Sequence, residues 1–169
     1  MTKLHDILNV RFINESPVLH LIGEKVVNRY FAIFSILVQV RQQRRVLSLL
    51  WKSLRSTRNI RSIPEDCLRK LLFVRSTADD TLASYESFVC HFCIEGAWKS
   101  LLKALSSANS FNRIFKVHIR YLNTIIENIS FGGLKEQNFK VLQNCLDGVS
   151  QLNSLVLSFY VGDASVLQL

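Results

Sequence analysis

The sequence contains little glycine and proline and has no long apolar run. Its 169 residues include 6 glycines and 2 prolines, whereas β-sandwiches and barrels need a turn about every ten residues. A turn-rich β protein is therefore excluded, and long helices are favoured. The longest uncharged stretch of the first expected helix, residues 30–40, is shorter than the roughly 20 apolar residues that cross a bilayer. No membrane span is expected.

The N-terminus has no apolar run after a basic beginning. It reads Met-Thr-Lys-Leu-His, which is not the pattern of a secretory signal. The four cysteines, Cys67, Cys90, Cys93 and Cys145, are therefore expected as free thiols in a reducing compartment. This predicts a cytoplasmic protein.

Residues that could carry chemistry are scattered. Cys90, His91 and Cys93 lie close together, but a zinc site needs four ligands and no second pair follows at similar spacing. These cysteines are expected to pack as small apolar groups, so no metal is predicted. His118 lies among apolar residues and is expected to be a hydrogen-bonded core or interface residue. No glycine-rich phosphate loop and no partnered nucleophile occurs, so neither catalytic activity nor a cofactor is expected.

The overall composition is that of one folded domain. The hydrophobic fraction is 49% and the charged fraction 20%, values typical of globular chains. A chain of this length can bury a core of its own. Residues 1–169 are therefore predicted to form a single helical domain. Its first part, residues 1–22, contains Pro17 and is expected to be an irregular segment.

Apolar periodicity predicts about four long helices. In residues 24–56 apolar positions recur by four and three, and the first half is apolar nearly all round, so it is expected to be buried on several sides. Pro64 and the two acids after it mark a helix start. That helix is expected to run to about residue 106, with a kink or interruption at 77–81.

Two further helices complete the prediction. Asn109 or Ser110 can cap a third helix, which Gly132 and Gly133 end with a turn. The last helix is expected from about Leu134 to Tyr160. Long helices joined by short loops predict an all-α fold, an antiparallel bundle.

The positive charge is concentrated in one window. The formal net charge is +8, and residues 41–75 contain two acids and ten bases: Arg41, Arg44, Arg45, Lys52, Arg55, Arg58, Arg61, Arg69, Lys70 and Arg75. The window therefore accounts for the whole excess. It is compatible with a solvated helix face, with nucleic-acid phosphates or with an acidic protein. Nucleic-acid binding is disfavoured because no helix-turn-helix or RRM pattern occurs and Trp51 alone interleaves the bases.

Three stretches resemble one protein family. The first comprises Pro-Val-Leu-His-Leu-Ile at 17–22, Tyr-Phe-Ala-Ile-Phe at 30–34 and Leu-Val-Gln-Val-Arg at 37–41. The second is Ile-Glu-Gly-Ala-Trp at 94–98, and the third is Phe-Lys-Val-His-Ile-Arg-Tyr-Leu at 115–122. In order and spacing they resemble the C-terminal domain of the gamma-tubulin complex components, the Spc97/Spc98 family. The sequence at residues 38–41 and 117–125 is most similar to component five of that family.

The resemblance implies a partner and a place in the cell. It implies direct binding of gamma-tubulin, association with other gamma-tubulin complex components, and microtubule nucleation at a microtubule-organising centre such as the centrosome or spindle pole. The contact residues expected from exposure and charge are Phe12, Asn14, His20, Arg41, Arg44 and Arg45.

The sequence also departs from the family pattern. Gly96 stands where most members have proline. The resemblance starts inside the C-terminal domain, so a fragment, a short isoform or a reduced gene without the family's N-terminal domain is expected. Two alternatives stay open: a basic helical nucleic-acid binder or general scaffold, and an enzyme that uses Cys93 or His118.

Overall fold

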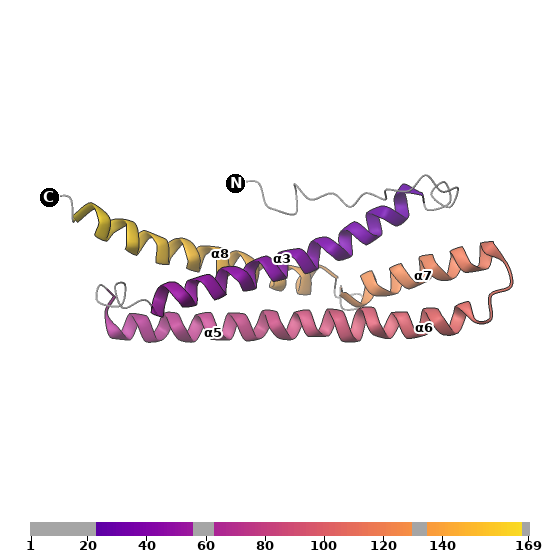
Figure 1. Cartoon of the computed structure of the whole chain (residues 1–169), viewed down its shortest axis with the longest axis horizontal. Helices are drawn as coiled ribbons and strands as arrows, with labels where there is room; N and C mark the ends of the chain where they lie inside the picture. Colours follow the sequence, from indigo (N-terminus) through magenta and orange to yellow (C-terminus); the bar gives the residue numbers. More distant parts are fainter. Residues whose placement is uncertain (1–22, 56–62, 130–134, 167–169) are drawn as a thin grey trace. The chain divides into compact units, whose positions relative to one another are not determined.

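Every regular element that the structure describes is helical. The computed structural model describes residues 23–55, 63–129 and 135–166, with the side chains of 135–139 and 159–166 left aside. Figure 1 follows the elements along the chain: α3 (Glu24–Arg55), α5 (Glu65–Ser87), the π-helix η1 (Phe88–Glu95), α6 (Gly96–Leu105), α7 (Phe111–Ile129) and α8 (Lys135–Val166). The predicted all-α fold is confirmed. The irregular segment expected at 1–22 and the turn at Gly132 and Gly133 lie outside the described residues.

The expected helix starts are present. The backbone N–H of Leu68 donates to the Pro64 carbonyl at 2.9 Å, which places Pro64 just before the first turn of α5. Glu65 and Asp66 occupy that first turn, where the exposed N–H groups favour negative charge. At α7 the cap is Ser110, because its Oγ accepts the N–H of Arg113 at 3.4 Å.

The interruption expected at 77–81 is wrong, because α5 continues through it. Thr77 Oγ1 donates to the Phe73 carbonyl at 3.0 Å, and Thr81 Oγ1 donates to the Thr77 carbonyl at 2.7 Å. The hydroxyls are thus satisfied within the helix. The irregularity lies further on, at η1. The final helix also extends beyond the predicted Tyr160, to Val166.

The chain divides into two compact units. The first unit comprises Met1–Gln39 and Glu86–Phe139, and the second comprises Val40–Tyr85 and Lys140–Leu169. Helix α3 therefore contributes its first half to one unit and its second half to the other. The single-domain expectation stays a prediction, and each unit is described here on its own.

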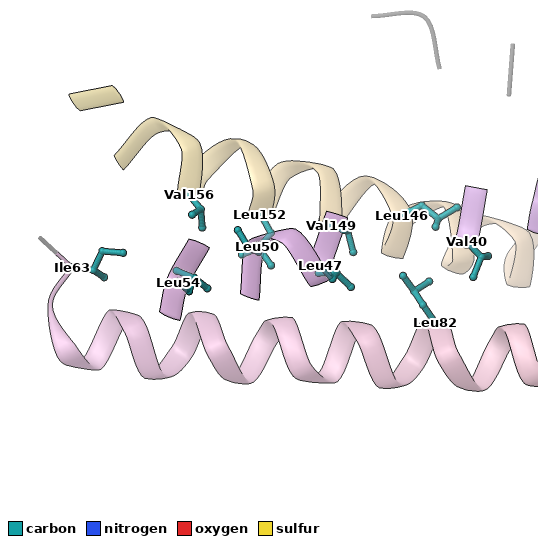
Figure 2. Packing of buried hydrophobic residues seen from close by; sticks show 10 residues of the cluster. All are labelled: Val40, Leu47, Leu50, Leu54, Ile63, Leu82, Leu146, Val149, Leu152 and Val156. Carbon is teal, nitrogen blue, oxygen red and sulfur yellow. The ribbon is translucent and has the colours of Figure 1, made fainter. Parts of the chain in front are cut away.

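The second unit has a continuous aliphatic core. Figure 2 shows side chains of α3, α5 and α8 pointing toward one another, together with one from the segment before α5. Leu47 and Val156 are fully buried, and Leu82 is nearly so. The cluster comprises Val40, Leu47, Leu50, Leu54, Ile63, Leu82, Leu146, Val149, Leu152 and Val156. Burial of such side chains stabilises a fold by about 1.5–3 kcal/mol each.

The first unit buries apolar side chains from α3, η1, α6 and α7. They are Val26, Ile33, Val89, Cys93, Ala97, Leu101, Leu122, Ile125 and Ile129. In this unit α7 follows α6 and lies beside it (Figure 1). The expectation that the first half of α3 is buried on several sides is wrong for the described residues. Tyr30 is 39% exposed and Phe34 40% exposed, whereas Val26 and Ile33 are buried.

Candidate functional site

The predicted arginines lie on α3 in the second unit. Arg41 and Arg45 are exposed, whereas Arg44 is half-buried. The Arg44 Nε lies 3.3 Å from Oδ1 of Asp79 on α5. Arg44 is therefore engaged within the fold. Phe12, Asn14 and His20 lie outside the described residues.

Arg75 joins α5 to α3. Its Nη2 lies 3.2 Å from Oδ2 of Asp79, and its Nε donates to the Leu47 carbonyl at 3.2 Å. The Arg75 side chain is only 15% exposed. Asp79 thus binds a different guanidinium group with each carboxylate oxygen. This ion-pair network was not foreseen from the sequence, although the i,i+4 spacing of Arg75 and Asp79 was a usable signal.

Trp51 lies between two cations. The guanidinium carbons of Arg55 and Arg75 lie 5.2 and 5.3 Å from the ring centroid, within the range of cation–π attraction. Arg69 also pairs with Glu65, at 2.7 Å on the exposed side of α5. Much of the basic window therefore stabilises the second unit, and the surface available to a partner is smaller than the charge count suggested.

In the first unit, residues from all three motif stretches meet. The Tyr30 hydroxyl lies 2.7 Å from His118 Nε2, which joins α3 to α7. Trp98 packs edge-on against Tyr121 with ring centroids 6.0 Å apart. Arg29 Nε adds a second polar link, donating to Asn123 Oδ1 at 2.8 Å. The residues that carry the family resemblance thus hold this unit together.

The electrostatics of this cluster favour a neutral histidine. Burial lowers the pKa of His118 below its ordinary value of 6.5. Burial raises the pKa of Tyr30, and the neighbouring Tyr121 raises it further. A neutral imidazole with an unprotonated Nε2 accepts the Tyr30 hydroxyl proton, whereas a protonated Nε2 can only donate. His118 is thus hydrogen-bonded, as expected, and its partner is a tyrosine.

The cysteine–histidine cluster does not converge. Cys93 is fully buried, and burial, with a smaller contribution from Cys90, raises the pKa of its thiol to about 11. A thiol with that pKa is protonated at neutral pH and is a poor nucleophile or ligand. His91 points outward and lies 3.4 Å from Glu95. Within residues 23–55, 63–129 and 135–166, no three His, Cys, Asp or Glu side chains gather as a metal site.

An apolar groove of about 340 Å³ lies between α5 and α8 in the second unit. Phe73, Val74 and Thr77 form one wall, and Cys145, Gly148 and Leu152 belong to the other. Phe73 is 72% exposed, which is unusual for a large aromatic side chain.

No helix in the described part of the chain is long and apolar enough to cross a membrane.

Comparison with known proteins gives one result. The model of the family described as gamma tubulin complex component C-terminal matches residues 2–167. The match covers both units and the motif stretches at 17–41, 94–98 and 115–122. A search of curated proteins returns no match.

Proposed function

The chain belongs to the gamma-tubulin complex component family, because the model of that family's C-terminal region matches it, and on that premise we propose that it binds gamma-tubulin directly and supports microtubule nucleation. The family match carries the proposal. Members of this family are structural components of gamma-tubulin complexes, which implies a microtubule-organising location in the cell. The sequence at residues 38–41 and 117–125 supports assignment to component five. We propose the cytoplasmic centrosome or spindle pole as the location of the protein.

The proposed contact surface includes the exposed guanidinium groups of α3. Arg41 and Arg45 are four residues apart on a helix and therefore lie on one face. Arg44 supports this face through Asp79 and is half-exposed itself. Phe12, Asn14 and His20 complete the proposed contact set. Such exposed cations suit an acidic protein surface, where complementary charge raises both the association rate and the specificity.

Co-purification with gamma-tubulin tests the surface. The informative variant is Arg41→Glu with Arg45→Glu, because both residues are exposed on α3. It should weaken binding by at least about tenfold at physiological salt. Lys103→Glu with Lys140→Glu is the matched control, since both lysines are exposed and the charge change is the same. Equal weakening by both variants would show that this face is not the contact.

Nucleic-acid binding is the alternative that the basic window allows. A phosphate-binding face would show a steep loss of affinity with increasing salt, because each neutralised phosphate releases counterions. The internal engagement of Arg44, Arg55, Arg69 and Arg75 leaves fewer bases for phosphates. Absence of any shift of RNA or DNA at low salt would remove this alternative, and binding of RNA but not gamma-tubulin would replace the proposal.

A further inference from the structure

A polar hollow of about 420 Å³ lies in the first unit, where α6 ends and α7 begins. Three bases of α7 line it, together with two serines and one asparagine. The Ser107 hydroxyl already donates to the Ala104 carbonyl at 3.0 Å, which leaves Ser110 and Asn112 as donors for a ligand. Its lining residues are Ala104, Ser107, Ser110, Asn112, Arg113, Lys116, Val117 and Arg120. Arg113, Lys116 and Arg120 are exposed, so the hollow is open to a ligand from solvent.

Among the residues that the structure describes, the bases of the hollow have no acidic partners. Residues 96–126 contain five bases and no aspartate or glutamate. Lys99 pairs with Glu95 at 2.9 Å, whereas Arg113, Lys116 and Arg120 pair with no carboxylate among the residues that the structure describes. Like charges three and four residues apart destabilise a helix by a few tenths of a kcal/mol per pair. Folding therefore does not account for this arrangement.

We propose that this hollow binds a short acidic segment of a partner protein. Arg113 and Arg120 are seven residues apart, so they are separated by roughly 10 Å along the helix axis. An extended peptide covers that length with about three residues, which places two or three consecutive carboxylates within reach of the bases. Ser110 and Asn112 can donate hydrogen bonds to carboxylates or to the peptide backbone. The first turn of α7 adds backbone N–H groups that favour negative charge.

The lining favours a peptide over a nucleic acid. Single-stranded nucleic acids are held by aromatic side chains on which successive bases stack. Of the described residues, no aromatic one lines the hollow, and the apolar ones that line it are Ala104 and Val117. Small aliphatic groups provide no stacking surface but accommodate peptide methylenes. The acidic segment therefore fits the chemistry better.

The residues of this site differ from those of the proposed gamma-tubulin contact set. Its residues belong to the first unit, whereas Arg41 and Arg45 belong to the second. The two proposals share no side chain. Each can therefore fail while the other holds.

The test uses the full chain and a fluorescein-labelled peptide of about six glutamates, followed by fluorescence anisotropy near 0.15 M salt. Arg113→Glu with Lys116→Glu and Arg120→Glu should weaken binding by at least about 30-fold. The matched control is Lys52→Glu with Lys70→Glu and Lys140→Glu, which changes the net charge equally at exposed lysines of the other unit. It should stay within about threefold of the unmodified chain, because none of these lysines lines the hollow and exposed charges are screened by salt.

A variant without charge change distinguishes a built site from a diffuse positive field. Asn112→Ala should weaken peptide binding about 3- to 10-fold, because the hydrogen-bond donors of its side chain are lost while every charge is kept. Unaltered circular dichroism and thermal midpoint establish that each variant is folded. Unchanged affinity in this folded variant would overturn the assignment of the hollow.

Three other outcomes would also overturn the proposal. The first is absence of peptide binding by the unmodified chain, and the second is equal weakening by the control variant. The third is tighter binding of an oligouridylate or of inorganic phosphate than of the peptide, abolished by the same α7 substitutions, which would assign the hollow to nucleic acid or a small anion. Gamma-tubulin co-purification on the same samples reports separately on the α3 face.

Discussion

At the scale of single residues, the hydrogen bond between Tyr30 and His118 is the most informative contact of the first unit. It joins α3 to α7 at 2.7 Å, and both residues belong to the stretches that resemble the family. Sequence reasoning placed His118 on an apolar face and expected a hydrogen bond, but it could not name the donor. The partner lies 88 positions away in the chain, and only the packing of helices brings the two rings together.

This contact predicts a pH dependence of stability. The unfolded chain binds a proton at His118 with a pKa near 6.5, and burial lowers that pKa in the folded chain. The stability that depends on a neutral His118 is therefore fully present above about pH 6.5. It is lost as the pH falls through the lowered pKa of His118 in the folded chain. Urea unfolding at about pH 7.5 and pH 5.5 measures the loss. His118→Gln should reduce the difference between the two pH values, and an unchanged difference would assign the effect to other groups.

The tyrosine side of the contact gives a matched test. Tyr30→Phe removes the hydroxyl and leaves the ring in place. It should lower the free energy of unfolding by about 0.5–1 kcal/mol at neutral pH, a modest loss because Tyr30 is 39% exposed. In the His118→Gln background the same substitution should cost less, and a double-mutant cycle measures that coupling. Strict additivity would mean that the hydrogen bond does not form in solution.

The Asp79 network makes a residue-scale prediction in the second unit. Asp79→Ala leaves the Arg75 side chain, which is 15% exposed, without its carboxylate. The free energy of unfolding should fall by about 1–2 kcal/mol. The adjacent Asp80 is exposed, so Asp80→Ala should change stability by no more than about 0.5 kcal/mol. Thermal denaturation of the two variants side by side measures this, and equal losses would contradict the network's structural role.

At the scale of elements, the helix boundaries were largely predictable and the irregularities were not. Pro64 and Ser110 mark helix starts through local chemistry that acts within one turn. The π-helix η1, in which Val89 and Cys93 are buried, has no comparable local signal in the sequence. The threonines at 77–81 were misread because their hydroxyls bond to carbonyls four residues back.

Gly96 follows η1 directly and carries a prediction of its own. Its backbone is helical, with φ −62° and ψ −44°, and an added Cβ would meet nothing within 4 Å. Gly96→Ala should therefore raise the free energy of unfolding by about 0.5–1 kcal/mol. Gly96→Pro should lower it despite the suitable φ, because the N–H bond to the Cys93 carbonyl is lost and Glu95 is forced from its helical conformation. Chemical denaturation distinguishes the two. Destabilisation by alanine would show that the glycine is required there.

At the scale of the whole molecule, the family and the fold class followed from the sequence, and the functional surface followed only in part. The motif stretches and the apolar periodicity identified a helical gamma-tubulin complex component, and the family match over residues 2–167 agrees. Charge counting located the basic window but could not show that Arg41 and Arg45 are exposed whereas Arg44 and Arg75 are partly buried. It also passed over Arg113, Lys116 and Arg120, because the chain outside the window is neutral on average. The acid-free stretch at 96–126 was the signal for them.

The most direct test of the central claim is the equilibrium affinity of the folded full chain for purified gamma-tubulin. A titration followed by light scattering or a fluorescent label should give saturable binding with a dissociation constant of about 1 μM or tighter, which corresponds to about −8 kcal/mol. Circular dichroism of the same sample confirms that the helices are present. Saturable binding of this strength is the predicted result. A fully helical chain that shows no association with gamma-tubulin at about 10 μM would contradict the proposed binding.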